Sequence, residues 1–548
     1  MKTPLSNFCH WEKTSPDHIF FRQPVEGKWI EYSFQKAGDE IRKIAAELKA
    51  QNFPPKSNIA ILSKNCAHWI IADLAIWMAG HISVPLYANS SAASIKQILE
   101  HSESKAIFVG KLDDYDHQKK GIPDHVTKIS ISLFGIHEGI SWEDIISNQK
   151  PLIDFSERGE DELLTIMYTS GTTGKPKGVM FNSKAFDHTT RILIEYLRLN
   201  APIPDRPRLF SYLPLCHIAE RNLTEMLVCY SGGSVSFVES LDTFARDVAE
   251  VQPDMFFGVP RIWARFKEKI LEKMPQKKLD TLLSIPIISG IVKKSIHKKL
   301  GLSKANMKGT GASPMPASLF EWLEKLGITV REIYGMTENC ALSHANQGKI
   351  KFGTVGQIMR TVDVRFTEEQ EILTKHSALM MGYYKEPDLT AQVMTSDGFL
   401  KTGDQGALDS EGFLTITGRV KDQFKTDKGK YISPAPMETR LQKNTDIEQV
   451  CVVGMGIPQP IALIQLSASG KTKSKEEIIE SISQSIKDIN PTVEHYEQLR
   501  KAVIMKEDWT VPNGLITPTL KVKRNEVEKL HLAKYPQWYA LEGMVVWE

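Results

Sequence analysis

Short apolar runs alternate with helix-like segments in the first part of the chain, and this alternation constrains the fold more than any other feature. Residues 58–63 and 83–87 are typical of buried strands, whereas the apolar segment 69–80 between them has the length of a helix and ends at a glycine. A strand, a helix and a strand in this order indicate a parallel sheet with helices on both faces. Similar strand-like runs recur at 105–110, 234–238 and 327–335.

The pattern changes after about residue 350, where short β-type runs separated by turn residues predict a β subdomain. These runs occupy residues 362–367, 371–375 and 412–418. The last part of the chain combines two strand-like runs with an amphipathic helix and predicts a small α+β domain. These three elements are expected at 449–454, 461–466 and 475–489.

The length of 548 residues is too great for one ordinary hydrophobic core, so more than one domain is expected. We place a boundary within 418–422, between the β subdomain and the C-terminal elements. The prediction is an α/β protein. Its large N-terminal domain, 1–419, holds parallel-rich sheets with flanking helices and the β subdomain, and a small α+β domain occupies 420–548.

Charge and cysteine content exclude several classes of protein. The formal net charge is only +2, so a nucleic-acid partner is not expected. The six cysteines form no C-x-x-C pair, which favours a reducing compartment over a disulfide scaffold or a zinc site. The sequence also has no apolar leader and no run of 18 apolar residues. We expect a cytoplasmic enzyme that is a monomer or a homodimer.

A loop rich in glycine and hydroxyl groups follows a strand-like run at 163–167. Residues 168–178 read Tyr-Thr-Ser-Gly-Thr-Thr-Gly-Lys-Pro-Lys-Gly. Glycines let backbone amides approach a phosphate, hydroxyls donate hydrogen bonds and lysines add positive charge, so this composition favours a polyphosphate. The pattern is not that of a kinase-type loop, because Pro176 stands where a serine or threonine is required and has no amide to donate. A flexible linker is the alternative interpretation.

The loop resembles, position by position, the signature of the adenylate-forming superfamily, which includes acyl-CoA synthetases, luciferases and peptide-synthetase adenylation modules. The resemblance extends over nearly the whole chain and implies ATP, magnesium and a thiol acceptor such as CoA. It implies a catalytic charge at Lys177 and a magnesium ligand at Thr169. The loop residues that it assigns to the nucleotide are Thr169, Ser170, Gly171, Thr172, Thr173 and Gly174.

Two further segments resemble family signatures around the base and the phosphates. Residues 334–338, Tyr-Gly-Met-Thr-Glu, are similar to the segment in which the tyrosine packs on adenine and the Thr–Glu pair works at the phosphates. The resemblance therefore implies that Glu338 holds magnesium and takes part in catalysis. The nucleotide-binding residues that it implies here are Tyr334, Gly335, Met336 and Thr337, together with Gly311, Ala312 and Ser313 of a segment that lines the adenine and acyl sites.

The last family signatures concern the ribose and the movement of the C-terminal domain. Asp404 and Arg419 match residues that bind the ribose hydroxyls, and a carboxylate suits this role because it accepts from two adjacent hydroxyls. Lys421 matches a hinge about which the C-terminal domain of the family rotates, so mobility is implied for residues 420–548. Lys425 lies in a segment similar to the loop that moves in for thioester formation.

The resemblance also implies a lysine for the adenylation step within residues 515–524. Lys521 matches this lysine, but Lys523 would point to the same side of an extended segment, so the choice between them stays open. The carboxylic acid is ionised at neutral pH and needs no general base. Fixed positive charge and magnesium must instead stabilise the attack of one anion on another.

Residues 211–221 and 257–263 are the most informative about the substrate. They resemble the long-chain and bubblegum-type fatty acyl-CoA synthetases, and His217 falls at the junction of their acyl and nucleotide pockets. We therefore predict that a fatty acid, ATP and CoA form acyl-CoA through acyl-AMP. The alternatives are an acyl-AMP ligase that serves a carrier protein, a ligase for aryl or short-chain acids, and a non-catalytic homologue that binds ATP or lipid.

The segment 261–300 is strongly basic, with eleven Lys or Arg residues against three acids. It is interrupted by an apolar stretch at 282–292. Such a segment can make weak peripheral contact with an anionic membrane, at the inner membrane surface. A solvated charged face explains the charge equally well.

Overall fold

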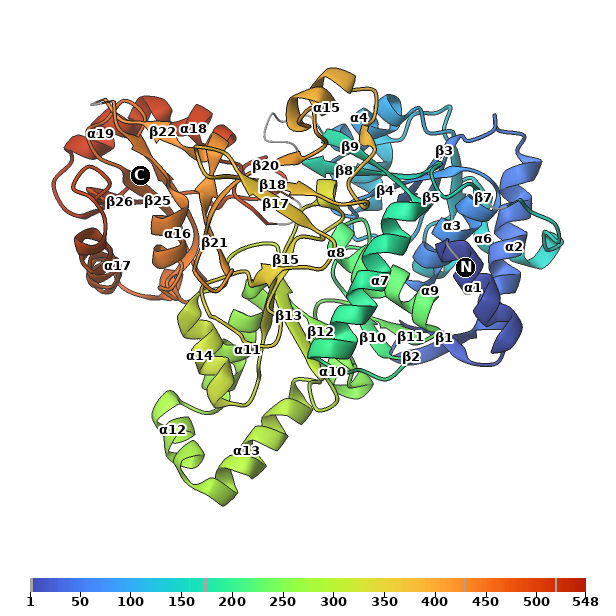
Figure 1. Ribbon diagram of the computed structural model, residues 1–548, viewed down its shortest axis with the longest axis horizontal. Helices are drawn as coiled ribbons and strands as arrows, with labels where there is room; N and C mark the ends of the chain where they lie inside the picture. Colours follow the sequence, from blue (N-terminus) through green and yellow to red (C-terminus); the bar gives the residue numbers. More distant parts are fainter. Residues whose placement is uncertain (1–2, 157, 171–175, 428, 518–519) are drawn as a thin grey trace.

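The computed structural model describes residues 3–156, 158–170, 176–427, 429–517 and 520–548 (Figure 1). The protein is a mixed α/β molecule with several sheets and flanking helices, which confirms the predicted fold class. The expected residues Gly171, Thr172, Thr173 and Gly174 lie outside the described residues.

The largest sheet has eight strands in the order β19-β9-β8-β4-β3-β5-β6-β7. Strands β4, β3, β5, β6 and β7 run parallel to one another and to β8, whereas β9 is antiparallel to both of its neighbours. The bounds are β3 (Asn58–Leu62), β4 (Ile82–Leu86), β5 (Ala106–Val109), β6 (Thr127–Ser130), β7 (Ile140–Ser141), β8 (Leu163–Ser170), β9 (Pro176–Asn182) and β19 (Gly382–Tyr383). The expected parallel sheet is therefore present, with an antiparallel edge.

Helices cover both faces of this sheet, as the sequence pattern predicted. Every residue of α3 (Ala67–Met78) is buried, because α3 lies between the sheet and α2 (Phe34–Ala50). The opposite face packs against α4 (Ala92–Ser102). Side chains alternate between the two faces along β3, with Ile59 in the first of these cores and Ala60 in the second.

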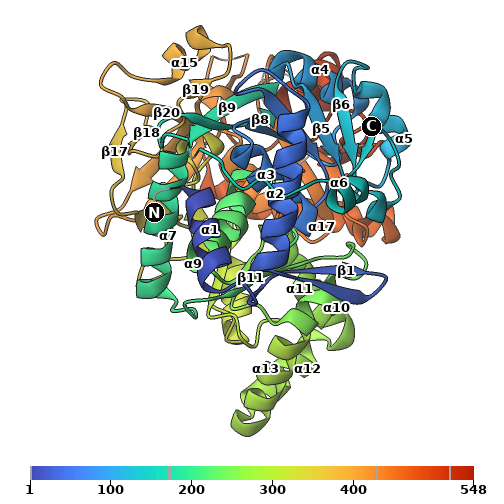
Figure 2. The ribbon, with the colours of Figure 1, turned by 90° about the vertical axis from the view of Figure 1, so that its right-hand side faces the viewer.

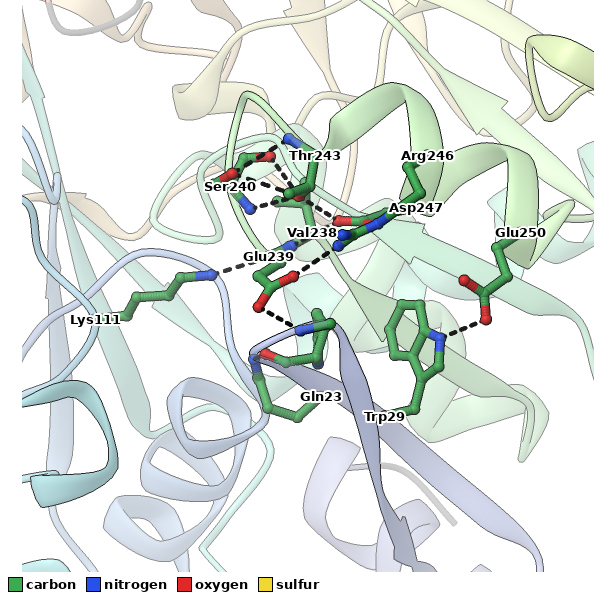
Figure 3. Close-up of polar contacts among 12 residues, drawn as sticks. Gln23, Trp29, Lys111, Val238, Glu239, Ser240, Thr243, Arg246, Asp247 and Glu250 are labelled. Atoms are coloured by element: carbon green, nitrogen blue, oxygen red, sulfur yellow. Dashed lines mark hydrogen bonds and ion pairs between the residues drawn. The ribbon is translucent and has the colours of Figure 1, made fainter.

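A four-stranded sheet in the order β10-β11-β1-β2 lies beside the first and is fastened by polar contacts (Figure 3). Glu239 lies two residues after the end of β11, accepts a hydrogen bond from the backbone of Gly27 at 3.0 Å and pairs with Arg246 at 2.6 Å. These contacts tie the β1–β2 turn to α10 (Phe244–Val251). The strands are β1 (Ile19–Val25), β2 (Lys28–Ser33), β10 (Arg208–Ser211) and β11 (Ser234–Phe237).

A five-stranded sheet, β12-β13-β14-β15-β16, packs its own core against α11 (Pro260–Lys273) and α14 (Ala317–Lys325). The expected strand at 327–335 is wrong in its first half. Gly327 has a φ of 73° just after α14, and only residues 331–334 form a strand. The bounds are β12 (Met255–Phe257), β13 (Met307–Gly311), β14 (Arg331–Tyr334), β15 (His344–Ala345) and β16 (Gln357–Ile358).

The predicted β subdomain is an antiparallel sheet in the order β17-β18-β20-β21. Its strands are β17 (Asp363–Phe366), β18 (Glu371–Lys375), β20 (Leu400–Leu408) and β21 (Leu414–Arg419). A short hairpin of β22 (Phe424–Lys425) and β23 (Tyr431–Ile432) follows. The β-type runs expected at 362–367, 371–375 and 412–418 are thus confirmed, although Gly412 lies in the turn before β21 with a φ of 79°.

The C-terminal domain has one sheet between two pairs of helices, in agreement with the predicted α+β tail. The amphipathic α17 (Lys475–Ile489) and α16 (Ala435–Leu441) cover one face, and α18 (Arg524–His531) and α19 (Tyr535–Ala540) cover the other. The strands are β24 (Ile447–Val453), β25 (Ile461–Leu466), β26 (Lys501–Ile504) and β27 (Val545–Trp547).

Candidate active site

The phosphate loop connects two antiparallel strands at one side of the large sheet. Strands β8 and β9 pair so that Thr169 lies opposite Lys177 and Ser170 lies opposite Pro176. The hairpin therefore holds Thr169 and Lys177 side by side at the point where the chain enters and leaves the loop.

Lys177 lies among charged and aromatic groups from three other segments. Its ammonium is 5.4 Å from the centre of the Tyr383 ring, and the Tyr383 hydroxyl donates to Glu338 Oε1 at 2.9 Å. Burial lowers the pKa of Lys177, and the nearby ammonium of Lys421 lowers it further against the carboxylates of Glu338 and Glu386. Two predicted lysines, Lys177 and Lys421, and the predicted metal ligand are thus brought together, which is an environment suited to a polyphosphate.

The donors at this point fit magnesium bound together with a nucleotide. Glu338 offers one carboxylate, held on one oxygen by Tyr383, and Thr169 offers a hydroxyl. Magnesium in nucleotide enzymes typically binds one or two protein oxygens and completes its shell with phosphates and water. Within the part of the chain that the structure describes, no cluster of three or more His, Cys, Asp or Glu forms an all-protein site.

Asp404 is the centre of a second cluster, formed because β20 and β21 pair it directly with Arg419. Arg419 Nε donates to Asp404 Oδ1 at 2.7 Å, and the Tyr334 hydroxyl donates to Oδ2 at 2.7 Å. The carboxylate raises the pKa of Arg419, in opposition to the effect of burial. Each carboxylate oxygen keeps a second lone pair, so Asp404 can accept from two ribose hydroxyls while it orients the ring of Tyr334.

The segment Gly311–Ser313 follows β13 and approaches the neighbouring strand closely. A Cβ atom on Gly311 would lie 2.6 Å from the carbonyl oxygen of Ile333, so only glycine fits here. Ala312 has a φ of 67°, a left-handed conformation that costs an alanine about 1 kcal/mol or more. Ser313 is exposed. This strained turn directly follows β13, where Gly311 lies opposite Ile333, the residue before Tyr334.

A short turn after Tyr334 sets the position of Glu338. The backbone of Met336 donates to Asn339 Oδ1 at 2.8 Å, and residues Thr337–Asn339 form a 3₁₀ turn. Gly335 is required because a Cβ atom there would lie 2.5 Å from the backbone of Ala341. The carbonyl of Glu338 accepts from Met380 at 2.9 Å, which ties the turn to the segment that carries Tyr383.

His217 stands at the start of α8 (Ile218–Glu220) and is neutral at pH 7. Burial, reinforced by the ammonium of Lys521, lowers its pKa to about 4. Its Nδ1 accepts from the backbone of Ala219 at 3.3 Å, so the neutral ring carries its proton on Nε2. His217 can therefore donate one hydrogen bond to a substrate oxygen. The neighbouring Glu220 is buried, and its Oε1 accepts a hydrogen bond from the Ser211 hydroxyl at 2.8 Å, so it stabilises the core.

Lys521 reaches this region from the C-terminal domain. A turn holds its backbone, because Lys521 N donates to Thr517 Oγ1 at 3.0 Å and Thr517 N donates to the Lys521 carbonyl at 2.7 Å. Part of the side chain remains exposed, yet surrounding protein lowers the pKa of Lys521 to about 8, and Arg419 lowers it while Asp404 opposes the shift. Lys521 thus lies within electrostatic reach of His217 and the Asp404 cluster. Lys523 instead precedes α18, with its backbone donating to Leu515 at 2.8 Å.

The predicted residue Lys425 ends strand β22 and lies beside another strand of the same hairpin. Its ammonium is 5.5 Å from the ring centre of Tyr431 in the β22–β23 hairpin.

The C-terminal domain contacts the N-terminal region through an ion pair between Arg261 of α11 and Glu448 of β24. Arg524 joins α18 to the segment 420–422 and to α16 through ion pairs with Asp422, at 3.9 Å, and with Glu438.

Sequence reasoning missed Tyr383, although it binds the predicted metal ligand and lies under Lys177. The signal that could have found it is the run Gly382-Tyr-Tyr-Lys-Glu-Pro387, where two tyrosines stand in a short turn-rich segment. Tyr383 approaches Lys177 because β19 pairs with β9, with Tyr383 opposite Val179. That pairing joins segments about 200 residues apart, beyond the range of local pattern.

Comparisons with known proteins show the family to which the chain belongs. Residues 8–384 match the model of the AMP-binding enzyme family, and residues 421–540 match the AMP-binding enzyme C-terminal domain. The chain is 28% identical to the long-chain-fatty-acid–CoA ligase FadD15 of Mycobacterium bovis, over 94% of this chain and 93% of that protein.

Solved structures share the fold. The adenylation domain of a carboxylate reductase from Mycobacterium chelonae has a TM-score of 0.80 at 20% identity, covering 98% of this chain and 91% of that chain. The anthranilate CoA ligase AuaEII, in complex with anthranoyl-AMP, has a TM-score of 0.77 at 18% identity, covering 96% and 97%. The chain therefore belongs to the AMP-binding enzyme family, the adenylate-forming superfamily that its motifs resemble.

Proposed function

We propose that this protein is a long-chain fatty acid–CoA ligase that forms acyl-CoA from a fatty acid, ATP and CoA through acyl-AMP. The observation that carries the proposal is that Lys521 of the C-terminal domain lies within electrostatic reach of His217, Arg419 and Asp404. This places a lysine of one domain beside the residues of the other domain that would bind the ribose and the acyl group. The long-chain relative supports the choice of acid.

The first half-reaction needs charge stabilisation more than proton transfer. The fatty acid carboxylate attacks the α-phosphorus, an O–P bond forms, and the bond to pyrophosphate breaks. Lys521 would neutralise the two approaching anions, while Lys177 and Lys421 would stabilise the departing pyrophosphate. His217 Nε2–H would orient the carboxylate. Magnesium, held by Glu338 and Thr169 together with the phosphates, would supply further charge neutralisation.

In the second half-reaction the thiol of CoA gives up its proton to solvent, its sulfur forms a bond to the acyl carbonyl carbon of acyl-AMP, and the bond to AMP breaks. We propose that residues 420–548 move as a domain about Lys421 between the two steps and carry Lys425 towards the site. The ion pair between Arg261 and Glu448 joins the two sides of such a movement, in the arrangement that has Lys521 near the nucleotide site.

Glu448→Gln is expected to change the balance of the two half-reactions. Loss of this partly exposed pair would weaken the adenylate-forming arrangement by about 0.2–1 kcal/mol, so ATP–pyrophosphate exchange should fall up to about fivefold. Thioester formation from supplied acyl-AMP should not fall. A variant in which both rates drop together would contradict a domain movement that breaks this contact. Glu480→Gln on the exposed side of α17 is the matched control.

The rate of adenylation is expected to fall as the pH rises above about 8. The pKa of Lys521 is lowered to about 8, so its ammonium is present below that pH and is lost above it. The ratio kcat/KM for ATP–pyrophosphate exchange, which reports the free enzyme, should therefore drop about tenfold per pH unit on the alkaline side. Lys521→Arg should abolish this limb, because arginine stays charged. An unchanged alkaline limb in that variant would mean that another group titrates.

ATP–pyrophosphate exchange with straight-chain acids of increasing length, and with benzoate and anthranilate, tests the proposed acid. The proposal expects the highest kcat/KM with long chains. A maximum with an aromatic acid would favour the second candidate, an aryl-acid ligase, for which the fold shared with the anthranilate ligase is the supporting observation. Acyl-CoA formation with free CoA then distinguishes a CoA ligase from an acyl-AMP ligase that serves a carrier protein.

A further inference from the structure

A hairpin of two helices projects from the body of the molecule and contributes no residue to the candidate active site. Helix α12 (Gln276–Ser284) and helix α13 (Pro286–Lys299) meet at Ile285, and both views show them extending away from the sheets (Figures 1 and 2). Within the described residues, no helix is long and apolar enough to cross a bilayer. The hairpin nevertheless has an amphipathic character of its own.

The base of the hairpin is fixed to the protein, so the tip is held out rather than folded back. Leu279 of α12 and Ile296 of α13 are buried in the core of the five-stranded sheet region. Trp322 of α14 donates from Nε1 to Gln276 at 2.9 Å, and His297 Nε2 lies 2.9 Å from the carbonyl of Leu326. These contacts orient both helices.

The tip exposes large apolar side chains to solvent. Ile287 is 81% exposed, Ile291 is 65% exposed and Ile285 is 43% exposed. Ile287 and Ile291 are four residues apart on α13 and so lie on the same face of the helix. Single exposed apolar residues are common on proteins, but three exposed isoleucines at one projecting tip form an apolar patch of the kind that marks an interaction site.

The same face of α13 becomes cationic towards the base. Lys294 and Lys298 continue the row that begins at Ile287 and Ile291, and both are exposed. Residues 276–299, which form the two helices and their junction, contain six lysines and one acid. The hairpin is therefore strongly cationic, although the whole chain has a formal net charge of only +2.

We propose that the α12–α13 hairpin docks on an anionic lipid bilayer. The isoleucines of the tip would enter the boundary between headgroups and acyl chains, and the lysines nearer the base would remain among the phosphates. Charge complementarity selects an anionic membrane over a neutral one. This docking is independent of the proposed ligase reaction, because it uses none of the nucleotide-site residues.

Vesicle flotation of the full-length protein tests the docking. Wild-type protein should bind phosphatidylcholine vesicles that contain about 30 mol% phosphatidylglycerol and should bind pure phosphatidylcholine much less, with binding that weakens as salt is raised. Ile287→Ser with Ile291→Ser should lower the partition coefficient by roughly tenfold or more. Lys294→Gln with Lys298→Gln should lower it and reduce the salt dependence.

The matched control for the isoleucine pair is Ile153→Ser with Leu241→Ser, because these side chains are 82% and 80% exposed but lie elsewhere. The control should bind as wild type does. The proposal is overturned if wild-type protein does not bind the anionic vesicles, or if the hairpin pair and the control pair bind equally. Ile287→Cys carrying an environment-sensitive fluorophore should show a blue shift on vesicle addition, whereas Ile153→Cys should not.

Sedimentation of the same variants distinguishes a lipid surface from a second copy of the chain. If the isoleucine pair converts a dimer into a monomer and leaves vesicle binding unchanged, the hairpin is a contact between copies and the lipid proposal is wrong. The adenylation rate of each variant, measured without vesicles, should equal that of wild type and shows that the variants are folded. The failure of docking and the failure of ligase activity are thus separate results.

Discussion

Lys521→Ala is expected to lower the rate of acyl-adenylate formation by about 10²–10³-fold, the loss typical when one preorganised charge-stabilising group is removed. In the proposed reaction this lysine is the group by which the C-terminal domain acts on the nucleotide, and it lies within electrostatic reach of His217 and Arg419. Conversion of supplied acyl-AMP to acyl-CoA should be largely unchanged, since no pyrophosphate leaves in that step. ATP–pyrophosphate exchange and single-turnover thioester formation measure the two rates separately.

Lys523→Ala is the matched control, because it removes the same charge two residues away. It should lower adenylation far less, since Lys523 precedes α18 and its backbone is bonded to Leu515. If Lys523→Ala is the variant that loses adenylation, the assignment of the two lysines is reversed. Equal small effects in both would mean that neither lysine stabilises the attack.

Arg221→Ala is expected to destabilise the N-terminal domain by about 3–5 kcal/mol, because it leaves carboxylates buried without their partner. Arg221 is fully buried in a π-helical turn, Arg221–Met226, and pairs with Asp73 and, at 3.1 Å, with Glu225. It also donates to Thr165 of β8 at 3.0 Å. Burial, followed by the charge of Asp73, raises the pKa of Glu225, so one proton compensates the second carboxylate.

Arg191→Ala is the control, since Arg191 also pairs with a carboxylate four residues away, Asp187, but at the surface. Arg191→Ala should lower the free energy of unfolding by less than about 1 kcal/mol. Urea unfolding followed by tryptophan fluorescence is a suitable measurement, because the rings of Trp69 and Trp77 lie 5.5 and 5.4 Å from the Arg221 guanidinium. Equal midpoints for the two variants would contradict a structural role for the cluster. Arg221→Met combined with Asp73→Asn and Glu225→Gln should recover much of the loss.

Elements with strong local patterns were predictable. The strand at β3 and the helix α3 follow from runs of apolar residues whose length and end signals are local. The strand predicted at 327–335 was partly wrong, because Ile328 and Val330 are apolar for a different reason. They pack into the core beside α14 while Gly327 turns the chain, so burial without pairing imitates a strand.

In the candidate nucleotide site, too, the residue types were predictable from local motifs, whereas their contacts were not. Asp404, Arg419 and Tyr334 were identified from their motifs, but their joint hydrogen bonds depend on the pairing of β20 with β21 and on the approach of β14. Tyr383 lies outside the motifs that marked the site and reaches Glu338 through the pairing of β19 with β9 and the backbone bond from Met380 to Glu338. The membrane alternative for 261–300 was open in the sequence, because charge alone does not say which side chains are exposed.

The sequence by itself determined the family and the α/β class, and it predicted the types of residue at the candidate nucleotide site, because these depend on local composition and on motifs in order. The tertiary structure decided that Lys521 lies within electrostatic reach of Arg419 and Asp404, how Glu338 is held and where Ile287 and Ile291 are exposed. The physical reason is range. A motif specifies the chemistry of a side chain over a few residues, whereas its partners, its solvation and therefore its pKa are set by segments that meet only in the folded chain.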